Sequence, residues 1–404
     1  MKRFGFLTAL GALDWVAIGL LAVGLVFLAS GLLPTADASA TMGRILPILL
    51  FLATILIVAD LTAEAGLFDL VATRVAITAR GHFGRLFAAC VAFAALTTIV
   101  LNLDTTAVLL TPVMLALAGK LRVDGETDHV PALPLVLCTV WLANTASLLL
   151  PVSNLTNLLA AGRVKLSFAA FAARMSAAQA ASLLVTAALL WVFYWRRSRR
   201  GADHYEPPPP YRPADWWLLR ITALACLFFI AAILGGVQLE VASTIAAAMV
   251  VLAFAIRRRS ALRWSLIPWR LPVFVTGLFF VVQTISLHLL HPLTSALVSQ
   301  SDGAMGTFRA AATGAVLANL VNNLPAYVAG EAAVAAGNHV QLLGLLIGVN
   351  VGPVITPWAS LATLLWFERC LAFGVRIPLL RFTLTSACLA VAGITLSTAA
   401  LLLT

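Results

Sequence analysis

The chain has 404 residues, of which 62% are hydrophobic and only 10% are charged, and its mean hydropathy is +1.01. A soluble domain carries about 25% charged residues, so this composition excludes a soluble globular protein. The net charge of +10 lies largely on arginines in short loops, which indicates topology signals facing anionic lipid and no nucleic-acid partner.

Apolar runs of about 20 residues recur along the whole chain and predict membrane-spanning helices. The runs do not alternate polar and apolar residues, which excludes the strands of a membrane β-barrel. They cover residues 14–33, 45–61, 133–152, 177–195, 216–234, 240–256, 271–290 and 382–403. The sequence therefore predicts an all-α, multi-pass protein of the cell membrane with about 10 transmembrane helices.

A charged, proline-rich segment divides the chain into two halves. Residues 196–213 read RRSRRGADHYEPPPPYRP, which is too polar to cross lipid, and the four consecutive prolines predict an extended linker. Its arginines place it in the cytoplasm. The halves that it separates, residues 1–195 and 214–404, are predicted to be two transmembrane repeats.

Each half contains an interrupted apolar pair followed by a long span that is broken by Asn, Gly or Pro. In the first half these are the hairpin 84–118 and the broken helix 133–160. In the second half they are the hairpin 306–336 and the broken helix 341–366. Aligning Asn144 with Asn350 also aligns Pro151 with Pro357 and Asn154 with Ser360 without a gap, which predicts a duplication.

The basic residues predict that the two repeats are inverted. Arginines at 196–200 and 257–259 are assigned to the cytoplasm, so the hairpin 306–336 enters from outside. The basic residues that flank the hairpin 84–118 are also assigned to the cytoplasm, so this hairpin enters from inside. The same arrangement places the basic residues at 163–174 and at the N-terminus outside the cell, which departs from the positive-inside rule.

Paired, inverted, discontinuous helices are how many secondary carriers build a solute site at the middle of the membrane. A broken helix exposes amides at one end and carbonyls at the other, and such backbone is tolerated at this depth only inside protein or against water. Short polar side chains then complete the site. The predicted solute-binding residues are Asn102, Thr105, Thr106, Asn144, Ser147, Ser153, Asn154, Asn157, Asn322, Asn323, Asn350 and Thr356. The alternative for each asparagine is that it caps a helix end without touching solute.

Asp104 is the charged residue among these breaks and is the main predicted group for proton or cation coupling. A carboxylate at membrane depth is costly, so it is a functional residue by default. The alternative is a cap that binds free amides at the hairpin tip. Glu331, on the return leg of the second hairpin, is a second predicted group for a proton step.

Other signatures of chemistry are absent. The sequence has no GxxxxGK[ST] phosphate-binding loop, no HExxH and no CxxC, and no nucleophile–base set, so neither an enzyme nor a cofactor is predicted. The five cysteines are interpreted as small buried hydrophobes, with a thiol site for a soft metalloid as the alternative. Transport must then use an ion gradient or a separate partner.

Four segments carry a family resemblance: ADLTAEAGLFD, NLDTTAVLLTPVMLAL, ANTASLLLPVSNLTNLL and ANLVNNLPAYVAG. In this order they resemble the arsenical pump membrane proteins, which are arsenite and antimonite efflux permeases. These permeases belong to the wider ion transporter superfamily, together with divalent-anion/sodium symporters and NhaD-type sodium/proton antiporters. The resemblance extends from about residue 45 to residue 366.

The resemblance implies an inverted-repeat fold with two re-entrant hairpins and alternating access. It implies export of arsenite or antimonite in exchange for protons, with a soluble ATPase as a possible partner. Asp104 matches the hairpin carboxylate of the family, Asn154 and Asn157 match its SNLxN segment, and Asn322 and Asn323 match its NNLP tip.

One position departs from the family pattern. Many arsenite permeases read Asn-Asp-Gly at the first tip, whereas Leu103, Asp104 and Thr105 stand here. The alternative substrate is therefore a dicarboxylate, carried into the cell with sodium, although no arginine or lysine lies in the four breaks to bind a carboxylate. A passive channel is a third interpretation, and it predicts continuous pore-lining helices.

Overall fold

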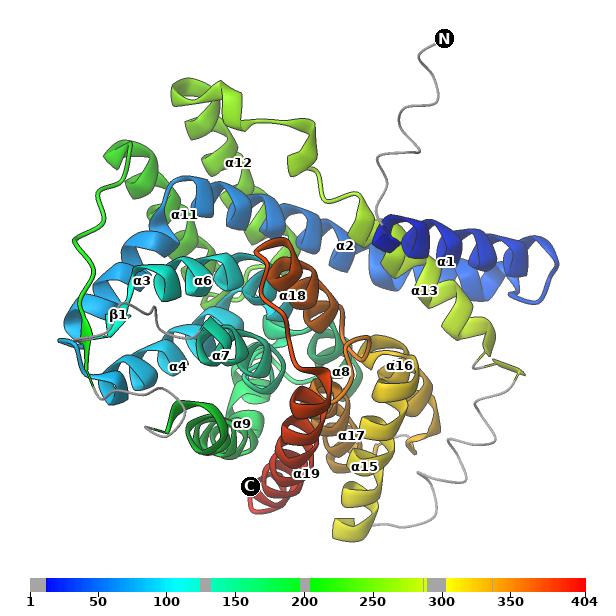
Figure 1. Cartoon of the computed structure of the whole chain (residues 1–404). Helices are drawn as coiled ribbons and strands as arrows, with labels where there is room; N and C mark the ends of the chain where they lie inside the picture. The colour runs from blue at the N-terminus through cyan, green and yellow to red at the C-terminus, as the bar shows by residue number, and fades with distance from the viewer. Residues whose placement is uncertain (1–11, 124–131, 197–203, 286, 289–302, 336) are drawn as a thin grey trace.

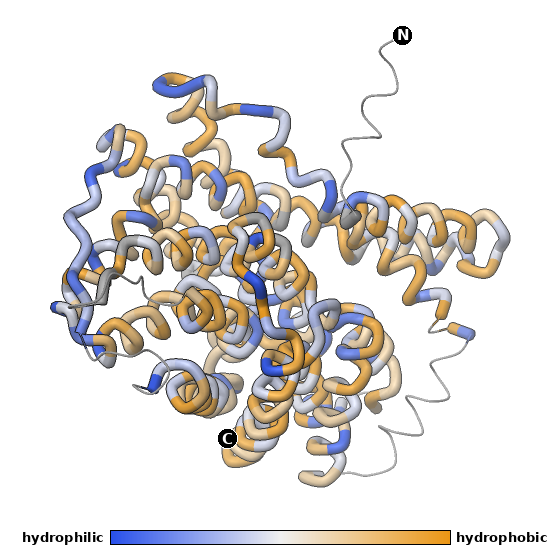
Figure 2. The backbone as a smooth tube through the Cα atoms, in the orientation of Figure 1, coloured by the Kyte–Doolittle hydropathy of each residue, from blue (hydrophilic) through white to orange (hydrophobic). Residues whose placement is uncertain are grey.

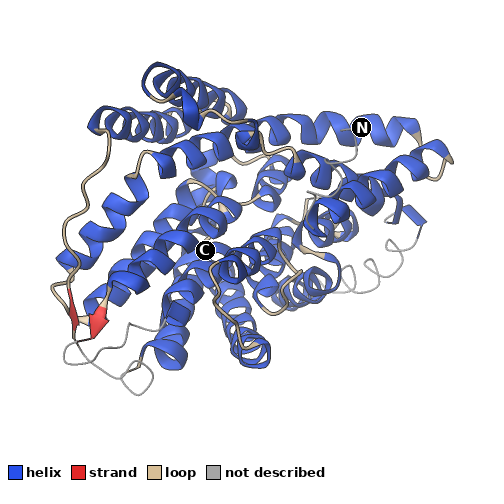
Figure 3. Cartoon of the chain, turned by 45° about the horizontal axis from the view of Figure 1, so that its top comes forward, coloured by secondary structure: helices blue, strands red, loops and turns tan. Residues whose placement is uncertain are grey.

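The computed structural model describes residues 12–123, 132–196, 204–285, 287–288, 303–335 and 337–404. These residues are almost entirely helical, with one pair of two-residue strands at an edge (Figure 3). Six helices among them are long and apolar enough to cross a membrane. Hydrophilic residues gather in the connecting loops, whereas most helices are predominantly apolar (Figure 2).

The first half contains long helices at both ends and interrupted helices between them. Its elements are α1 (Ala12–Ala29), α2 (Thr35–Glu64), α3 (Leu67–Thr78), α4 (Phe83–Val100), α5 (Leu103–Thr105), η2 (Thr106–Leu110), α6 (Thr111–Lys120), β1 (Arg122–Val123), α7 (Ala132–Thr145), η3 (Pro151–Ser153), α8 (Leu155–Val164), α9 (Phe168–Leu190) and η4 (Trp191–Trp195). The elements α5, η2 and α6 form one continuous helix with a π-helical turn in it.

The second half follows the same order of long and interrupted helices. Its elements are β2 (Tyr205–Glu206), α11 (Trp216–Leu234), α12 (Leu239–Arg257), η5 (Arg259–Ala261), η6 (Trp264–Leu266), α13 (Arg270–Ile285), α15 (Gly303–Val321), α16 (Asn323–Ala333), α17 (His339–Val351), η8 (Gly352–Val354), α18 (Leu361–Ala372) and α19 (Leu379–Leu402).

Asparagines stop the helices at both hairpin tips. At Asn102 the backbone is fully extended, and its side-chain oxygen accepts a hydrogen bond from the amide of Thr105 at 2.7 Å. At Asn322 the backbone takes φ = 94°, in the left-handed region that costs a non-glycine residue about 1 kcal/mol or more. Asparagine tolerates such positions because its short side chain bonds to the backbone nearby. Helices therefore end at both predicted tips.

Contacts between the two halves follow a reciprocal pattern: where a helix of the first half contacts a helix of the second, the two corresponding helices also contact each other. In chain order α1, α2 and α3 correspond to α11, α12 and α13, and α1 packs on α13 while α3 packs on α11 (Figure 1). In the same way α7 contacts α18 and α8 contacts α17. The helices α2 and α9 pack on their own counterparts, α12 and α19. A two-fold relation between the halves requires this pattern.

Small residues let α15 and α17 pack closely. A Cβ atom added to Gly348 would lie 1.9 Å from the carbonyl oxygen of Ala311, and one added to Gly344 would lie 2.8 Å from that of Thr307. Close backbone approach of this kind drives helix association inside lipid, where apolar side chains gain nothing by leaving the lipid tails. The second hairpin is thereby held against the broken helix that follows it.

The linker between the halves differs from a free spacer. Residues 207–210 form no helix or strand, and Tyr205 just before them is buried. Its hydroxyl donates to the carbonyl of Ala76 at 2.6 Å, and its ring packs on Phe83. Strand β2 also pairs with β1. These contacts fasten the linker to the ends of α3 and α4.

Some predicted boundaries differ from the structure. The helix predicted to be broken over 133–160 is interrupted between α7, which ends at Thr145, and α8, which begins at Leu155, with only the short η3 between them. The run 45–61 lies inside α2, which starts earlier, at Thr35, because the polar residues before the run are compatible with a helix. The N-terminal basic residues and linker residues 197–203 lie outside the described residues.

Candidate functional site

The N-terminal ends of four helical segments meet at one cavity. They are the starts of the continuous α5–η2–α6 helix, α8, α16 and α18, and residues from all four line the cavity. Helix α13 closes another side. The lining residues are Leu103, Asp104, Asn154, Leu155, Phe274, Val275, Leu278, Asn322, Asn323, Leu324 and Leu361. Both hairpin tips and both broken helices therefore contribute to this cavity.

Each of these helix ends carries a polar cap. The N-caps are Asn102, Asn154, Asn322 and Ser360, and each side-chain oxygen accepts from a backbone amide of its own first turn. Caps satisfy some of the free amides, but the dipoles of the helices still direct partial positive charge at the cavity. The cavity is thus favourable for a negatively charged group or for the oxygen atoms of a polar solute.

Asp104 supplies the negative group. It lies in the first turn of its helix and is 5% exposed. Among the described residues, its Oδ1 atom, Nδ2 of Asn102 and the hydroxyl of Thr105 are buried without a hydrogen-bond partner. The π-helical turn follows directly after Asp104, and such turns are frequent at functional sites. The tip therefore offers both acceptors and donors to a solute.

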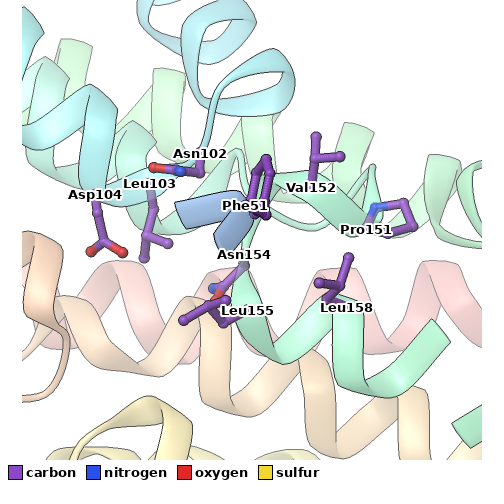
Figure 4. Close-up of a pocket in the computed structure, with 9 residues that line it drawn as sticks. All are labelled: Phe51, Asn102, Leu103, Asp104, Pro151, Val152, Asn154, Leu155 and Leu158. Atoms are coloured by element: carbon purple, nitrogen blue, oxygen red, sulfur yellow. The ribbon is translucent and has the colours of Figure 1, made fainter. Parts of the chain in front are cut away.

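A second small pocket adjoins the first and shares Leu103, Asp104, Asn154 and Leu155 with it. Figure 4 shows Leu103 and Asp104 on the hairpin at one side and Pro151 at the opposite side. The two pockets hold about 10 and 20 Å³ of free space. A single water needs about 10–15 Å³, so a larger solute requires the lining helices to move apart.

Asn350 ties the two halves together behind this cavity. Its side-chain oxygen accepts from Nδ2 of Asn154 at 3.1 Å and from the hydroxyl of Thr156 at 2.6 Å. Its side-chain nitrogen donates to Oδ1 of Asn157 at 2.7 Å. Asn157 in turn donates to the carbonyl of Ser147 at 2.6 Å. Asn350 and Asn157 therefore hold helix ends and broken backbone in place.

Asn144 makes the corresponding contact from the first half. Its Nδ2 donates to the hydroxyl of Thr363 at 3.2 Å and to the carbonyl of Val140 at 2.9 Å. The ungapped alignment that pairs Asn144 with Asn350 also pairs Asn157 with Thr363. The contact of Asn144 with Thr363 is therefore the equivalent of the contact of Asn350 with Asn157, with the two halves interchanged. Asn144 makes fewer hydrogen bonds to the other half than Asn350 does.

The structure divides the residues predicted for the site into two groups. Those that line the two pockets are Asn102, Asp104, Asn154, Asn322 and Asn323. Those that lie outside the lining are Thr105, Thr106, Asn144, Ser147, Ser153, Asn157, Asn350, Thr356 and Glu331. In the second group Thr106 donates to the carbonyl of Asn102, and Ser153 donates to that of Ile99. Most residues of the second group bond to backbone or to one another.

Glu331 lies in a different cavity. It is at the far end of α16 from the central cavity, and its Oε1 is 3.7 Å from Nε of Arg163, at the end of α8. Lys165 and His339 also line this cavity of about 290 Å³. Glu331 lies eight residues beyond Asn323, which lines the central cavity, and this corresponds to about 12 Å along α16.

One polar residue and the apolar lining of the pockets are not among the residues predicted from the sequence. Asn319 lies inside the segment ANLVNNLP, and its Oδ1 accepts from both the amide and the hydroxyl of Thr356, at 3.1 and 3.0 Å. Asn319 lies about one helical turn before the hairpin tip at Asn322, and this spacing could have identified it from the sequence. Phe51 of α2 and Phe274 of α13 line the pockets, and an apolar residue in an apolar run gives no such signal.

The metal-ligating and thiol side chains of the described residues do not gather at the central cavity. No three His, Cys, Asp or Glu side chains gather there as a metal site. The five cysteines are free and none lines either pocket of the site. The polar groups of the site are amides, hydroxyls and one carboxylate.

Comparisons with known proteins agree with the helical architecture. A family model described as "Citrate transporter" (CitMHS) matches residues 6–363. The chain is 28% identical to the arsenical pump membrane protein of Yersinia enterocolitica, over 78% of this chain and 76% of that protein. It is 25% identical to one from Escherichia coli, over 84% and 82%. The resemblance to arsenical pump membrane proteins is thereby confirmed.

Among solved structures, the Alcanivorax borkumensis YdaH transporter is similar, with a TM-score of 0.57 over 97% of both chains. At 13% sequence identity this likeness shows the fold alone. Together with the apolar helices, these matches confirm a multi-pass membrane protein of the cell membrane with a transporter fold.

Proposed function

The chain belongs to the citrate transporter (CitMHS) family, and from this premise we propose that it is a secondary active transporter that exports arsenite or antimonite in exchange for protons. The observation that carries the proposal is the position of Asp104. Its carboxylate lies in a cavity that both hairpin tips line, so one titratable group faces elements of both halves. The arsenical pump membrane proteins of the comparison supply the substrate class.

The chemistry of the solute fits this cavity. Arsenous acid, As(OH)3, is neutral at pH 7 and presents hydroxyl groups. Ionised Asp104 accepts hydrogen bonds from such hydroxyls, and Nδ2 of Asn102 donates to their oxygens. Once a proton binds, the carboxyl group loses acceptor capacity and the solute is held less tightly. Proton and solute then compete for one group, which is the requirement for exchange.

The packing supports alternating access. The exchanged contacts between halves favour the predicted inverted repeats, in which two related bundles move against each other around a central site. The small free volume of the two pockets fits a closed arrangement that opens toward one side at a time.

A sodium-coupled importer of an organic anion is the second candidate. Two observations favour it: the family description names citrate, and four helix N-termini direct positive partial charge at the cavity. Against it, neither pocket of the site contains an arginine or a lysine. A carboxylate solute would also lie beside Asp104, so it requires a bound cation or a protonated Asp104.

Transport into inverted membrane vesicles tests both candidates. With the vesicle interior acidic, wild type is expected to accumulate arsenite above its external concentration, and Asp104→Asn is expected to lose this accumulation. Asp69→Asn, which removes a carboxylate of α3 outside both pockets, is the control and should behave as wild type.

Three results separate the alternatives. Full activity in Asp104→Asn removes the coupling mechanism. Equilibration without accumulation indicates a passive channel. Sodium-dependent citrate or succinate uptake in intact cells, with no movement of arsenite, indicates the anion importer.

A further inference from the structure

A groove of about 530 Å³ lies between α3 and α4, away from the two pockets of the site. Its lining combines apolar side chains with two arginines. Leu70, Val71 and Ala89 are among the apolar members, and the cations are Arg74 and Arg85. Both arginine side chains are exposed. A charged and an apolar part therefore meet in one groove.

Both arginines lie near the turn that joins α3 to α4. Arg74 is four residues before the end of α3 at Thr78, and Arg85 is two residues after the start of α4 at Phe83. At 1.5 Å per residue they are about 6 Å and 3 Å from these helix ends. Leu70, Val71 and Ala89 lie further from the turn, beyond the arginines. The charge thus lies toward the turn, where Val75, Thr78 and Ala79 also line the groove, and the opposite end of the groove is apolar.

Aromatic side chains place this end of α4 at the membrane surface. The ring of Phe87 packs between Trp191 and Trp195, with ring centroids 5.2 and 5.0 Å away. Tryptophans gather at the level of the lipid headgroups, and Trp191 keeps part of its surface exposed here, whereas Trp195 is buried and donates to the carbonyl of Pro134. Phe87 follows Arg85 by two residues, so the arginines lie at headgroup depth and the apolar end of the groove reaches the acyl chains.

Neither arginine is neutralised by the protein. Among the described residues, the lining of the groove contains no aspartate or glutamate, and neither Arg74 nor Arg85 takes part in an ion pair. Ion pairs elsewhere in the described residues use other arginines, namely Arg163, Arg257, Arg258 and Arg270. Two guanidinium groups that line one groove match a phosphate, which arginine binds through two parallel hydrogen bonds.

We propose that this groove binds an anionic phospholipid. The phosphate is held between Arg74 and Arg85, and an acyl chain lies along Leu70, Val71 and Ala89. The apolar end of the groove selects a lipid over free phosphate, because inorganic phosphate gains nothing from it. Basic pockets between helices on the cytoplasmic side are a recurrent form of lipid recognition.

Purified full-length protein in neutral detergent tests the proposal with native mass spectrometry. Phosphatidylglycerol is expected to bind about tenfold or more tightly than phosphatidylcholine of the same chain length. In Arg74→Gln/Arg85→Gln the affinity for phosphatidylglycerol is expected to fall roughly 30-fold. Arg263→Gln/Arg376→Gln removes the same charge from exposed arginines outside the groove and should bind as wild type.

Several outcomes overturn the proposal. If wild type binds phosphatidylglycerol and phosphatidylcholine equally, the attraction is non-specific and the proposal fails. If both double variants lose the same affinity for phosphatidylglycerol, the attraction is again non-specific and the proposal fails. Ala89→Trp provides a separate check, since it fills the apolar end and leaves the charge unchanged. This variant should weaken phosphatidylglycerol but leave the weak binding of inorganic phosphate unaltered; unchanged lipid binding in Ala89→Trp also refutes the site.

Discussion

Replacing Asn350 by leucine should destabilise the protein more than the same change at Asn144, although the sequence aligns these two residues. Asn350 makes three side-chain hydrogen bonds to Asn154, Thr156 and Asn157. The change Asn350→Leu leaves Nδ2 of Asn154 and Oδ1 of Asn157 without those partners in a buried region. Each orphaned buried group costs about 1–3 kcal/mol, although hydrogen bonds between membrane helices average about 0.6 kcal/mol.

These values give a cost of roughly 2–5 kcal/mol for Asn350→Leu. Asn144→Leu should cost about 1 kcal/mol or less. Thr363 keeps its bond to Ser360, and Oδ1 of Asn144 has no partner in the described residues, so its removal relieves a buried orphan. Because both variants introduce leucine, the packing change is similar and the comparison isolates the hydrogen bonds.

The thermal unfolding of purified protein, followed by fluorescence-detected size exclusion, measures the difference. For a chain of this length the calculated costs correspond to a loss of roughly 3–8 °C for Asn350→Leu and about 1–2 °C for Asn144→Leu. A double variant of Asn350 and Asn157 should lose less than the sum of the single changes, since the two residues share one bond. Equal losses at Asn350 and Asn144 would refute the reasoning.

Three further changes test other parts of the structure. Gly348→Ala should lower the unfolding temperature, because the new Cβ would lie 1.9 Å from a carbonyl oxygen of α15; Gly162→Ala, with no atom within 4 Å, should be neutral or stabilising by up to about 1 kcal/mol. Glu331→Gln should keep proton-driven accumulation in vesicles, because Glu331 lies outside the cavity of Asp104; its loss would indicate a second proton site. Tyr205→Phe removes a 2.6 Å hydrogen bond to α3, costs about 1 kcal/mol, and should speed amide exchange in the α3–α4 turn; unchanged exchange would show that the linker does not hold this turn.

The positions of the helix breaks were predictable because they depend on local chemistry. Asn102 and Asn322 follow apolar runs directly, and asparagine at a helix start accepts from the amides that a new helix leaves free. Asp104 was identifiable as a candidate because a carboxylate in an apolar stretch is costly, and the structure places it in the central cavity. These signals lie within a few residues of sequence.

The grouping of residues around the cavity could not be predicted in the same way. The sequence treats Asn154 and Asn157 alike, yet Asn154 lines the cavity whereas Asn157 bonds to Asn350 and to the carbonyl of Ser147. Which side of a short helix faces the solute depends on the packing of the other half. The same holds for Phe274, which reaches the cavity only because α13 lies across it.

Charge in the central cavity bears on the choice between the two proposed substrates. Four helix N-termini supply partial positive charge, and the carboxylate of Asp104 is the ionisable group that faces it in the described structure. A neutral solute with hydroxyl groups leaves this balance unchanged, because it exchanges hydrogen bonds with Asp104 and Asn102 and brings no charge. A citrate trianion brings three negative charges toward one carboxylate with no lysine or arginine in the lining, so it needs protons or cations to enter with it. The direction of coupling follows from this difference: a neutral solute competes with the proton at Asp104 and is exchanged for it, whereas an anion requires the proton and must travel with it.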